Sequence, residues 1–211
     1  PIMIDLDLRY NESITEKQHT PEHIIDIIML YMESCKKLLN LQHNTTVDVY
    51  AMEKNDVNPV KEKKITKDGI HIIIGLSMHK GLQVLLRNMV LEEIGNIWDD
   101  LPITNSWDEV VDEGVTKGQV NWQLYGSRKP GNQAYLIKKH YELTYDDDEW
   151  SISENNIETF DTEKNLGKLS ARYNKYPKFD MHDSVEEEFA EACKSLGKKK
   201  RNIVVQENGK G

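Results

Sequence analysis

Apolar and polar residues alternate at the start of the chain, PIMIDLDLRY, as they do in a strand with one buried face. The pattern predicts a strand over residues 2 to 9, with the even positions from Ile2 to Leu8 on its apolar side. Asp5 and Asp7 share the other side, about 6 to 7 Å apart along the strand. Neighbouring carboxylates repel each other, so we expect a positive group between them.

Two longer segments carry apolar residues at helical spacing. The first follows Thr20, a residue type that caps helix N-termini, has Pro21 at its first position and extends to about residue 41. The second covers residues 79 to 98. A short capped segment is also predicted at 104 to 114.

Four further strands are predicted, at 45–53, 70–76, 120–127 and 134–145. The strand at 70–76 is almost wholly apolar and is expected at the centre of the sheet, after a polar connection at 55–69. The last two strands are expected to pair as a hairpin around the turn GSRKPG. This order of elements predicts an α+β fold with a mostly antiparallel sheet and flanking helices.

The chain changes character near residue 146. Residues 146–165 are acidic and aperiodic, and SVEEEFAEACKSLGKKKRN (184–202) predicts a short charged helix that runs into a basic stretch. The end, QENGKG, has the composition of a disordered chain. We expect a core domain over residues 1–150 and a linker with a connecting helix over 151–211. Because Pro1 stands directly before a strand, we also expect the sequence to be a piece of something longer.

Composition narrows the class of protein. The 211 residues, 38% hydrophobic and 30% charged, are enough for one domain with appendages. A net charge of −9 excludes a generally basic nucleic-acid-binding protein and leaves a local basic groove possible. Two cysteines exclude a disulfide framework and a cysteine-rich zinc site formed by this chain alone. Because no apolar run approaches the roughly 20 residues of a membrane helix, we expect no membrane partner.

Asp5 and Asp7 are the first residues that could carry chemistry. Two carboxylates on one strand face can hold a pair of Mg²⁺ or Mn²⁺ ions, as two-metal phosphoryl transfer requires. The alternative is a pair of surface acids neutralised by Arg9 or by a lysine. The acidic run YDDDEW (145–150) is a further possible metal site, although a solvated acidic segment explains it more simply.

His71 and Asp112 are the next candidates. Gly69 and His71 point to the same side of their strand, so a ligand could approach the backbone there, with Lys67 as a cation for a phosphate. A histidine in a buried strand can equally be a satisfied core residue. Asp112 follows two valines and is a third acid at the end of an apolar stretch.

The turn GSRKPG contains Arg128 and Lys129, whose charges and neighbouring backbone amides would suit a triphosphate. The alternative is an ordinary hairpin turn with solvated basic side chains. Two acids on one strand, a third acid elsewhere, a strand histidine and a basic turn are together the groups that nucleotidyl transfer requires.

Three motifs in this order resemble those of the archaeo-eukaryotic primase superfamily: IDLDL, KDGIHIII and VVDEGV. The extended third block, VVDEGVTKGQVNWQLYGSRKPG, is similar to the corresponding stretch of primase-polymerases. The resemblance covers roughly residues 1 to 145. It is closest to the primase half of the primase-helicases of large DNA viruses, the poxvirus and African swine fever virus type. GKLSARYNKYPKF (167–179) resembles the segment that leads there toward a superfamily III helicase.

The resemblance implies an RRM-like catalytic core that synthesises primers on a single-stranded DNA template from nucleoside triphosphates during viral DNA replication. It also implies two Mg²⁺ or Mn²⁺ ions, a helicase region in the same polypeptide and a cytoplasmic viral replication compartment. Asp5, Asp7 and Asp112 would be the catalytic metal ligands. The nucleotide would be bound by His71, Lys67, Ser127, Arg128 and Lys129.

Two positions depart from the family pattern. Gly69 stands where many members have serine, so a hydroxyl contact is expected to be lost, and Gln123 stands where arginine is frequent. Two other functions stay open: an inert primase-like module that positions DNA, and a metal-dependent nuclease or phosphotransferase. Candidate DNA contacts, which could equally be solvated charges, are Lys61, Lys63, Lys64, Lys67, Lys138, Lys139 and Lys198 to Arg201.

Overall fold

The computed structural model of the protein describes residues 1–197. The basic stretch from Lys198 to Arg201 and the C-terminal end predicted to be disordered lie outside the described residues. The helices and strands follow the order β1 (Ile2–Asn11), α1 (Pro21–Leu38), β2 (Thr45–Glu53), β3 (Asn58–Val60), β4 (Ile65–Ile74), α2 (Lys80–Ile97), α3 (Trp107–Val110), α4 (Glu113–Lys117), β5 (Leu136–Asp146), β6 (Glu149–Asn155), α5 (Thr162–Asn165) and α6 (Glu186–Leu196).

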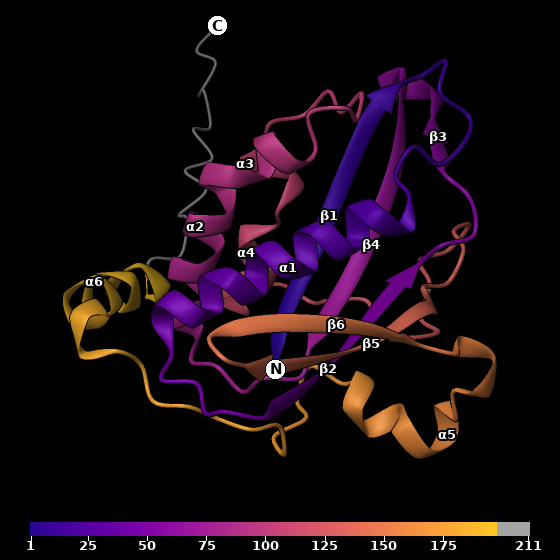
Figure 1. The fold of residues 1–211 in the computed structure, drawn as a ribbon. Coiled ribbons are helices and arrows are strands. Elements are labelled where there is room, and N and C mark those ends of the chain that lie inside the picture. The colour runs from indigo at the N-terminus through magenta and orange to yellow at the C-terminus, as the bar shows by residue number, and fades with distance from the viewer. Residues whose placement is uncertain (198–211) are drawn as a thin grey trace, which may run out of the picture.

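The strands form one open sheet, in the order β1-β4-β2-β5-β6, with β3 paired to β4 (Figure 1). Every pair of these strands is antiparallel. The structure thus confirms the expected α+β class with an antiparallel sheet and flanking helices, and it is compatible with a primase-type core. Strand β4 lies between β1 and β2, which confirms the central place expected from its apolar sequence.

Strand β4 begins earlier than the sequence analysis predicts. The polar connection expected at 55–69 contains β3 and the first half of β4. Polar residues are accommodated there because they find partners: the Thr66 hydroxyl donates to the carbonyl of Ile14, and the buried Asp68 carboxylate accepts from Lys17. Side-chain partners therefore allow a strand in a segment that lacks the expected apolar alternation.

The predicted hairpin between 120–127 and 134–145 is wrong. Residues 120–127 form no strand, and β5 pairs instead with β2 on one edge and β6 on the other. Strand β2 pairs along β5 from Leu136 to Tyr145, and β6 pairs with it from His140 to Asp146. Strand β6 lies within the acidic segment expected to be aperiodic. Its Trp150 is buried and donates to the carbonyl of Met32 in α1, which fixes the strand against the core.

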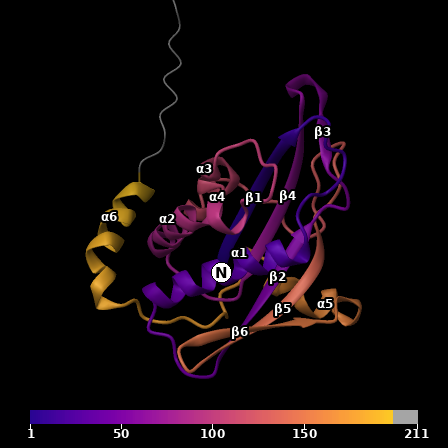
Figure 2. The ribbon, with the colours of Figure 1, turned by 45° about the horizontal axis from the view of Figure 1, so that its top comes forward.

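The two faces of the sheet are covered differently (Figures 1 and 2). Helices α1 and α2 pack on one face, against the even-numbered side chains of β1, and make the main core. A smaller cluster on the other face includes Met52 and Ile73, with Leu169 and Tyr176 from the segment after β6 packed against them. Asp5 and His71 lie on this second face, because they share the strand register of Met52.

The segment after β6 returns along the core. Ser77 forms a bridge with Lys178, and Leu39 forms one with Met181. Helix α6 lies beside α2, where Phe189 and Cys193 approach Gly81 (Figure 2).

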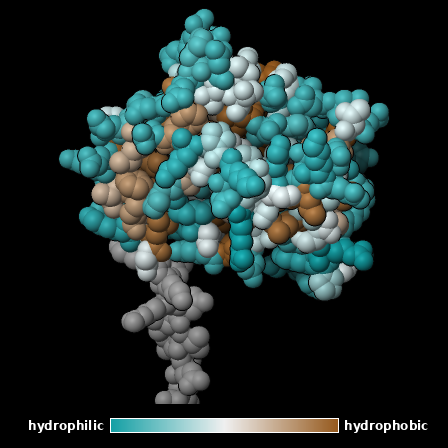
Figure 3. Space-filling view, turned by 90° about the horizontal axis from the view of Figure 1, so that it is seen from below, coloured by the Kyte–Doolittle hydropathy of each residue, from teal (hydrophilic) through white to brown (hydrophobic). Residues whose placement is uncertain are grey.

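The division at residue 150 stays a prediction. The face shown in Figure 3 is mainly hydrophilic, with apolar side chains in separate patches. Within the described residues, no helix combines the length and the apolar character that a membrane span needs.

Candidate active site

A cavity of about 390 Å³ opens on the second face of the sheet, where β1 and β4 lie side by side. Six of the eight residues that the sequence analysis singles out line it. Ser127 and Arg128 do not. The cavity is lined by Asp5, Leu6, Asp7, Lys54, Asp56, Asn58, Lys67, Asp68, Gly69, His71, Asp112, Asn121, Gln123, Lys129, Asn132 and Tyr135.

The strand register explains how the first two motifs meet. In the β1–β4 pair, Asp5 stands opposite His71 and Asp7 opposite Gly69. His71 Nε2 lies 3.4 Å from an oxygen of Asp5, and Lys67 Nζ lies 3.1 Å from an oxygen of Asp7. Arg9 also contacts Asp7, at 3.3 Å. Asp7 therefore has two positive partners, and Asp5 has the His71 ring nitrogen as its neighbour.

The third acid reaches the cavity through a short pairing with β1. Val111 forms a bridge with Leu6, and the backbone N–H of Asp112 donates to the carbonyl of Asp5 at 2.9 Å. One carboxylate oxygen of Asp112 accepts from the backbone N–H of Val115 at 2.6 Å, so Asp112 also caps the short helix α4. The three acids are thus gathered from two segments about 100 residues apart in sequence.

Arg87, in α2, holds in place the segment that carries Asp112. Its guanidinium is buried and donates to the carbonyl of Val111 at 2.7 and 2.9 Å and to the carbonyl of Asp108 at 2.8 Å. The Asp108 carboxylate also accepts a hydrogen bond from Arg87, at 2.9 Å, but this carboxylate is mostly exposed. A buried arginine that donates to two backbone carbonyls fixes the chain immediately before Asp112.

His71 is enclosed by aromatic rings. It stacks on Tyr135 with ring centroids 3.6 Å apart and on Trp122 at 4.8 Å, and its side chain is 3% exposed. Its Nδ1 lies 3.1 Å from the carbonyl oxygen of Gln123. Because a carbonyl only accepts, Nδ1 must carry a hydrogen in this bond. Nε2, which faces Asp5, is therefore the atom through which His71 can meet a ligand in the cavity.

Lys54 and Tyr135 belong to the cavity but were not singled out by the sequence analysis. Lys54 Nζ lies 4.9 Å from the centre of the Tyr135 ring. Burial and the nearby charges of Lys129 and Lys67 lower the pKa of Lys54, while Asp68 and Asp5 act in the opposite direction. A half-buried lysine beside two other lysines is stabilised by an anion. Lys54 directly follows the end of β2, and no motif marks it in the sequence.

The predicted basic turn lies partly outside the cavity. Lys129 lines it, whereas Ser127 and Arg128 are exposed, and the hydroxyl of Ser127 donates to the carbonyl of Leu124 at 2.7 Å. Among the candidate DNA contacts, Lys139 pairs with Glu154 and Lys138 donates to Asn55. Lys61, Lys63 and Lys64 are exposed.

A buried ionic network supports one wall of the cavity. Lys17 Nζ lies 2.9 Å from Asp68 and 3.3 Å from Glu53, and His19 Nε2 lies 2.6 Å from Glu53. The carboxylate of Asp68 also accepts from the backbone N–H of Gly69 at 2.8 Å. Burial alone would raise the pKa of Glu53, but hydrogen bonds and charge from His19 and Lys17 outweigh it and hold that pKa below its usual value.

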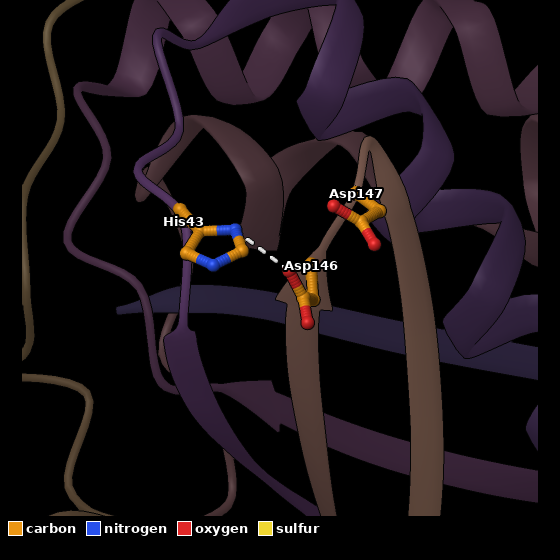
Figure 4. A group of neighbouring side chains, drawn as sticks. All are labelled: His43, Asp146 and Asp147. Atoms are coloured by element: carbon orange, nitrogen blue, oxygen red, sulfur yellow. Dashed lines mark ion pairs between the residues drawn. The ribbon is translucent and has the colours of Figure 1, made fainter.

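A second group with acidic side chains lies where β2 begins and β5 ends (Figure 4). His43, Asp146 and Asp147 are exposed, and their possible ligand atoms all lie within 4.8 Å of one another. His43 Nδ1 is 2.6 Å from an oxygen of Asp146. Within residues 1–197 this is the group of three His, Cys, Asp or Glu side chains that meets that distance, and Asp5, Asp7 and Asp112 are more widely spaced.

The chemistry of the cavity nevertheless suits hard divalent ions. Carboxylate oxygens are the ligands that Mg²⁺ and Mn²⁺ prefer, and two ions about 4 Å apart can be shared by acids that do not all touch. Asp7 would exchange its partners Arg9 and Lys67 for such an ion. Asp5, Asp7 and Asp112 are therefore a donor set that fits a pair of divalent ions.

Two comparisons place the chain among known proteins. Residues 1–141 match the family model described as the C962R protein N-terminal AEP domain. A protein of Acanthamoeba polyphaga mimivirus named "Putative helicase L207/L206" is 34% identical over 147 residues, which are 68% of this chain and 15% of that protein. The chain thus spans about a seventh of the length of this relative. It belongs to the archaeo-eukaryotic primase (AEP) family, as a domain of the kind found at the N-terminus of the C962R protein.

Proposed function

We propose that this domain is a DNA primase-polymerase that transfers nucleotides from nucleoside triphosphates to a strand paired with a single-stranded DNA template. The observation that carries the proposal is that Asp5, Asp7 and Asp112 line one cavity together with three lysines. Carboxylates suit divalent ions, and lysines suit phosphates. A cavity lined by both groups suits a metal-bound triphosphate.

Each side of the cavity has a distinct role in this proposal. Asp5, Asp7 and Asp112 would hold two Mg²⁺ or Mn²⁺ ions. Such ions, when bound, lower the pKa of an attacking hydroxyl and neutralise the charge on the transferred phosphate. The 3′-hydroxyl of the growing strand would form a bond to the α-phosphorus, and pyrophosphate would leave.

The lysines of the cavity would position the triphosphate. Lys54, Lys67 and Lys129 line it together, and Lys54 is the one whose pKa is lowered by burial and by the other two. If Asp7 binds a metal ion in place of Lys67, a bound triphosphate would give Lys67 a new anionic partner. His71 would contact the nucleotide through Nε2. Ser127 and Arg128 lie in the same turn as Lys129 and would reach the phosphates or the template only from outside the cavity.

The mimivirus relative carries the word helicase in its name and is far longer than this chain. We therefore propose that the domain is attached to a helicase region in its full polypeptide, with residues 151–211 as the connection. Priming next to a helicase that exposes single-stranded DNA would place the activity in the replication compartment of a virus-infected cell.

A synthesis assay separates this function from its alternatives. The domain is incubated with a single-stranded template, Mn²⁺ and one or all four labelled nucleoside triphosphates, and the template carries a second label. Products longer than two nucleotides whose composition follows the template support the proposal. A shortened template indicates a nuclease, and DNA binding without turnover indicates an inert module. Either of these results would contradict the proposal.

The position of Asp112 gives a testable prediction about Arg87. Replacing Arg87→Met removes the donors to the carbonyls of Val111 and Asp108 while filling a similar volume. We expect the rate of nucleotide incorporation to fall by about 10²-fold, because a displacement of about 1 Å in a positioned group has this effect. Steady-state kinetics at saturating nucleotide measure it, with circular dichroism to verify folding.

The matched control for Arg87 is Asp108→Ala. This change removes the exposed carboxylate but keeps the backbone carbonyl that Arg87 also contacts. Incorporation should stay within about threefold of wild type, since the Asp108 carboxylate is mostly exposed and Arg87 keeps its backbone carbonyl partners. Equal rates for Arg87→Met and wild type would contradict the assigned positioning of Asp112.

A further inference from the structure

The strongest unassigned feature of the cavity is the contact between Gly69 and Tyr135. Gly69 lies between Lys67 and His71 on the cavity side of β4 and opposite Asp7. A Cβ atom built on Gly69 would overlap the hydroxyl oxygen of Tyr135 and lie 3.4 Å from its ring carbon Cζ. The tyrosine hydroxyl thus occupies the space that a side chain at position 69 would fill.

The Tyr135 ring is held firmly in this place. It stacks on His71 with an angle of 14° between the ring planes, and the Lys54 ammonium lies near its face. The residue is 6% exposed. Its backbone carbonyl accepts from the N–H of Gly126 at 2.8 Å, which also fixes the start of β5. A ring packed in this way can direct its hydroxyl with little freedom of movement.

The hydroxyl itself is available to a ligand. Among residues 1–197, no group forms a hydrogen bond with it. It also differs from the hydroxyls of Tyr10, Tyr50 and Tyr141, which are fully buried without a hydrogen-bond partner. Burial, together with the charges of Asp5, Asp68 and Asp7, raises the pKa of Tyr135. A tyrosine hydroxyl is protonated at neutral pH in any case, so it can act as a hydrogen-bond donor.

We propose that the Tyr135 hydroxyl donates a hydrogen bond to a phosphate oxygen of the bound nucleoside triphosphate, and that glycine at position 69 is required to leave it room. The inference rests on the proposed function. Tyr135 shares the cavity with Lys54, Lys67 and Lys129, the cations assigned to the phosphates. Gly69 stands where many family members have serine, and the Tyr135 hydroxyl occupies the space of that side chain.

Equilibrium binding of a non-hydrolysable nucleoside triphosphate with Mg²⁺, measured by calorimetry, tests the inference. Tyr135→Phe should weaken binding about tenfold or more, because a hydrogen bond to a charged acceptor contributes about 1.5–3 kcal/mol. The same variant should bind the unphosphorylated nucleoside as the wild type does. Wild-type affinity for the triphosphate in Tyr135→Phe would overturn the inference.

Two double variants isolate the hydroxyl. Gly69→Ser alone should weaken binding, because its side chain collides with Tyr135. Gly69→Ser combined with Tyr135→Phe should recover affinity, because the serine hydroxyl enters the vacated space. Gly69→Ala with Tyr135→Phe fills the same space without a hydroxyl and should not recover. Equal affinities of the two double variants would contradict the inference.

These outcomes are distinguishable from a failure of the proposed function. A wild-type domain that binds no triphosphate would contradict the proposed function and, with it, this inference. A wild-type domain that binds and incorporates nucleotides while Tyr135→Phe binds equally well would contradict this inference alone.

Discussion

Replacing Asp5→Asn or Asp7→Asn is expected to reduce template-directed nucleotide incorporation at least about a thousandfold, which corresponds to about 4 kcal/mol of transition-state stabilisation. The asparagine side chain keeps the volume of each acid but loses the charge that two divalent ions require. Both side chains are only partly buried, and the apolar face of β1 is unchanged, so the fold should persist. Primer extension and thermal unfolding measure the two effects separately.

Asp112→Asn completes this prediction with the same expected loss. Asparagine also caps helix N-termini, so α4 should keep its first hydrogen bond to Val115. The control is Asp26→Asn, an exposed residue of α1 on the opposite side of the sheet, which should leave incorporation unchanged. A double variant of Asp5 and Asp7 that extends a primer within tenfold of the wild-type rate would contradict the metal-dependent mechanism.

The second large effect is expected on stability. Asp68→Ala should lower the free energy of unfolding by about 3 kcal/mol, because removing one member of a buried ion pair leaves its partner with less compensating charge. Lys17 would keep only Glu53 as a partner, and the backbone N–H of Gly69 would lose its acceptor. Lys17 is a quarter exposed, which places the expected effect at the lower end of the range for buried pairs. Urea unfolding measures it.

An exposed ion pair serves as the control for Asp68. Glu33 pairs with Lys36 one turn along α1, and both side chains are accessible. Glu33→Ala should lower stability by less than about 0.5 kcal/mol. If Asp68→Ala were no more destabilising than Glu33→Ala, the Lys17–His19–Glu53–Asp68 network would not be a structural support of the cavity wall.

Alternation in the first strand was sufficient to predict much of the site. It placed Asp5 and Asp7 together on one face, and the structure confirms this face and the buried side that carries Leu6. The register with β4, which brings His71 to Asp5, follows from pairing between segments far apart in sequence. Single-strand periodicity contains no information on such pairing.

The cavity residues that the sequence did not reveal show the same limit of local patterns. Lys54 and Tyr135 flank two different strands, and neither stands in a motif, so only the folded sheet reveals that they meet. Strand β6 was missed because its acidic positions hide the buried Trp150. The predicted strand at 120–127 was wrong for a related reason: local alternation cannot show that β5 pairs with β2 and β6 instead.

The central claim is that the cavity on β1 and β4, and not the exposed group at His43, binds the metal ions and the triphosphate. Crystals of the domain grown with Mn²⁺ and a non-hydrolysable nucleoside triphosphate test it through the anomalous signal of manganese. We predict manganese peaks within coordination distance of Asp5, Asp7 and Asp112, with the phosphates beside Lys54, Lys67 and Lys129. Manganese confined to His43, Asp146 and Asp147, with no nucleotide in the cavity, would contradict the claim.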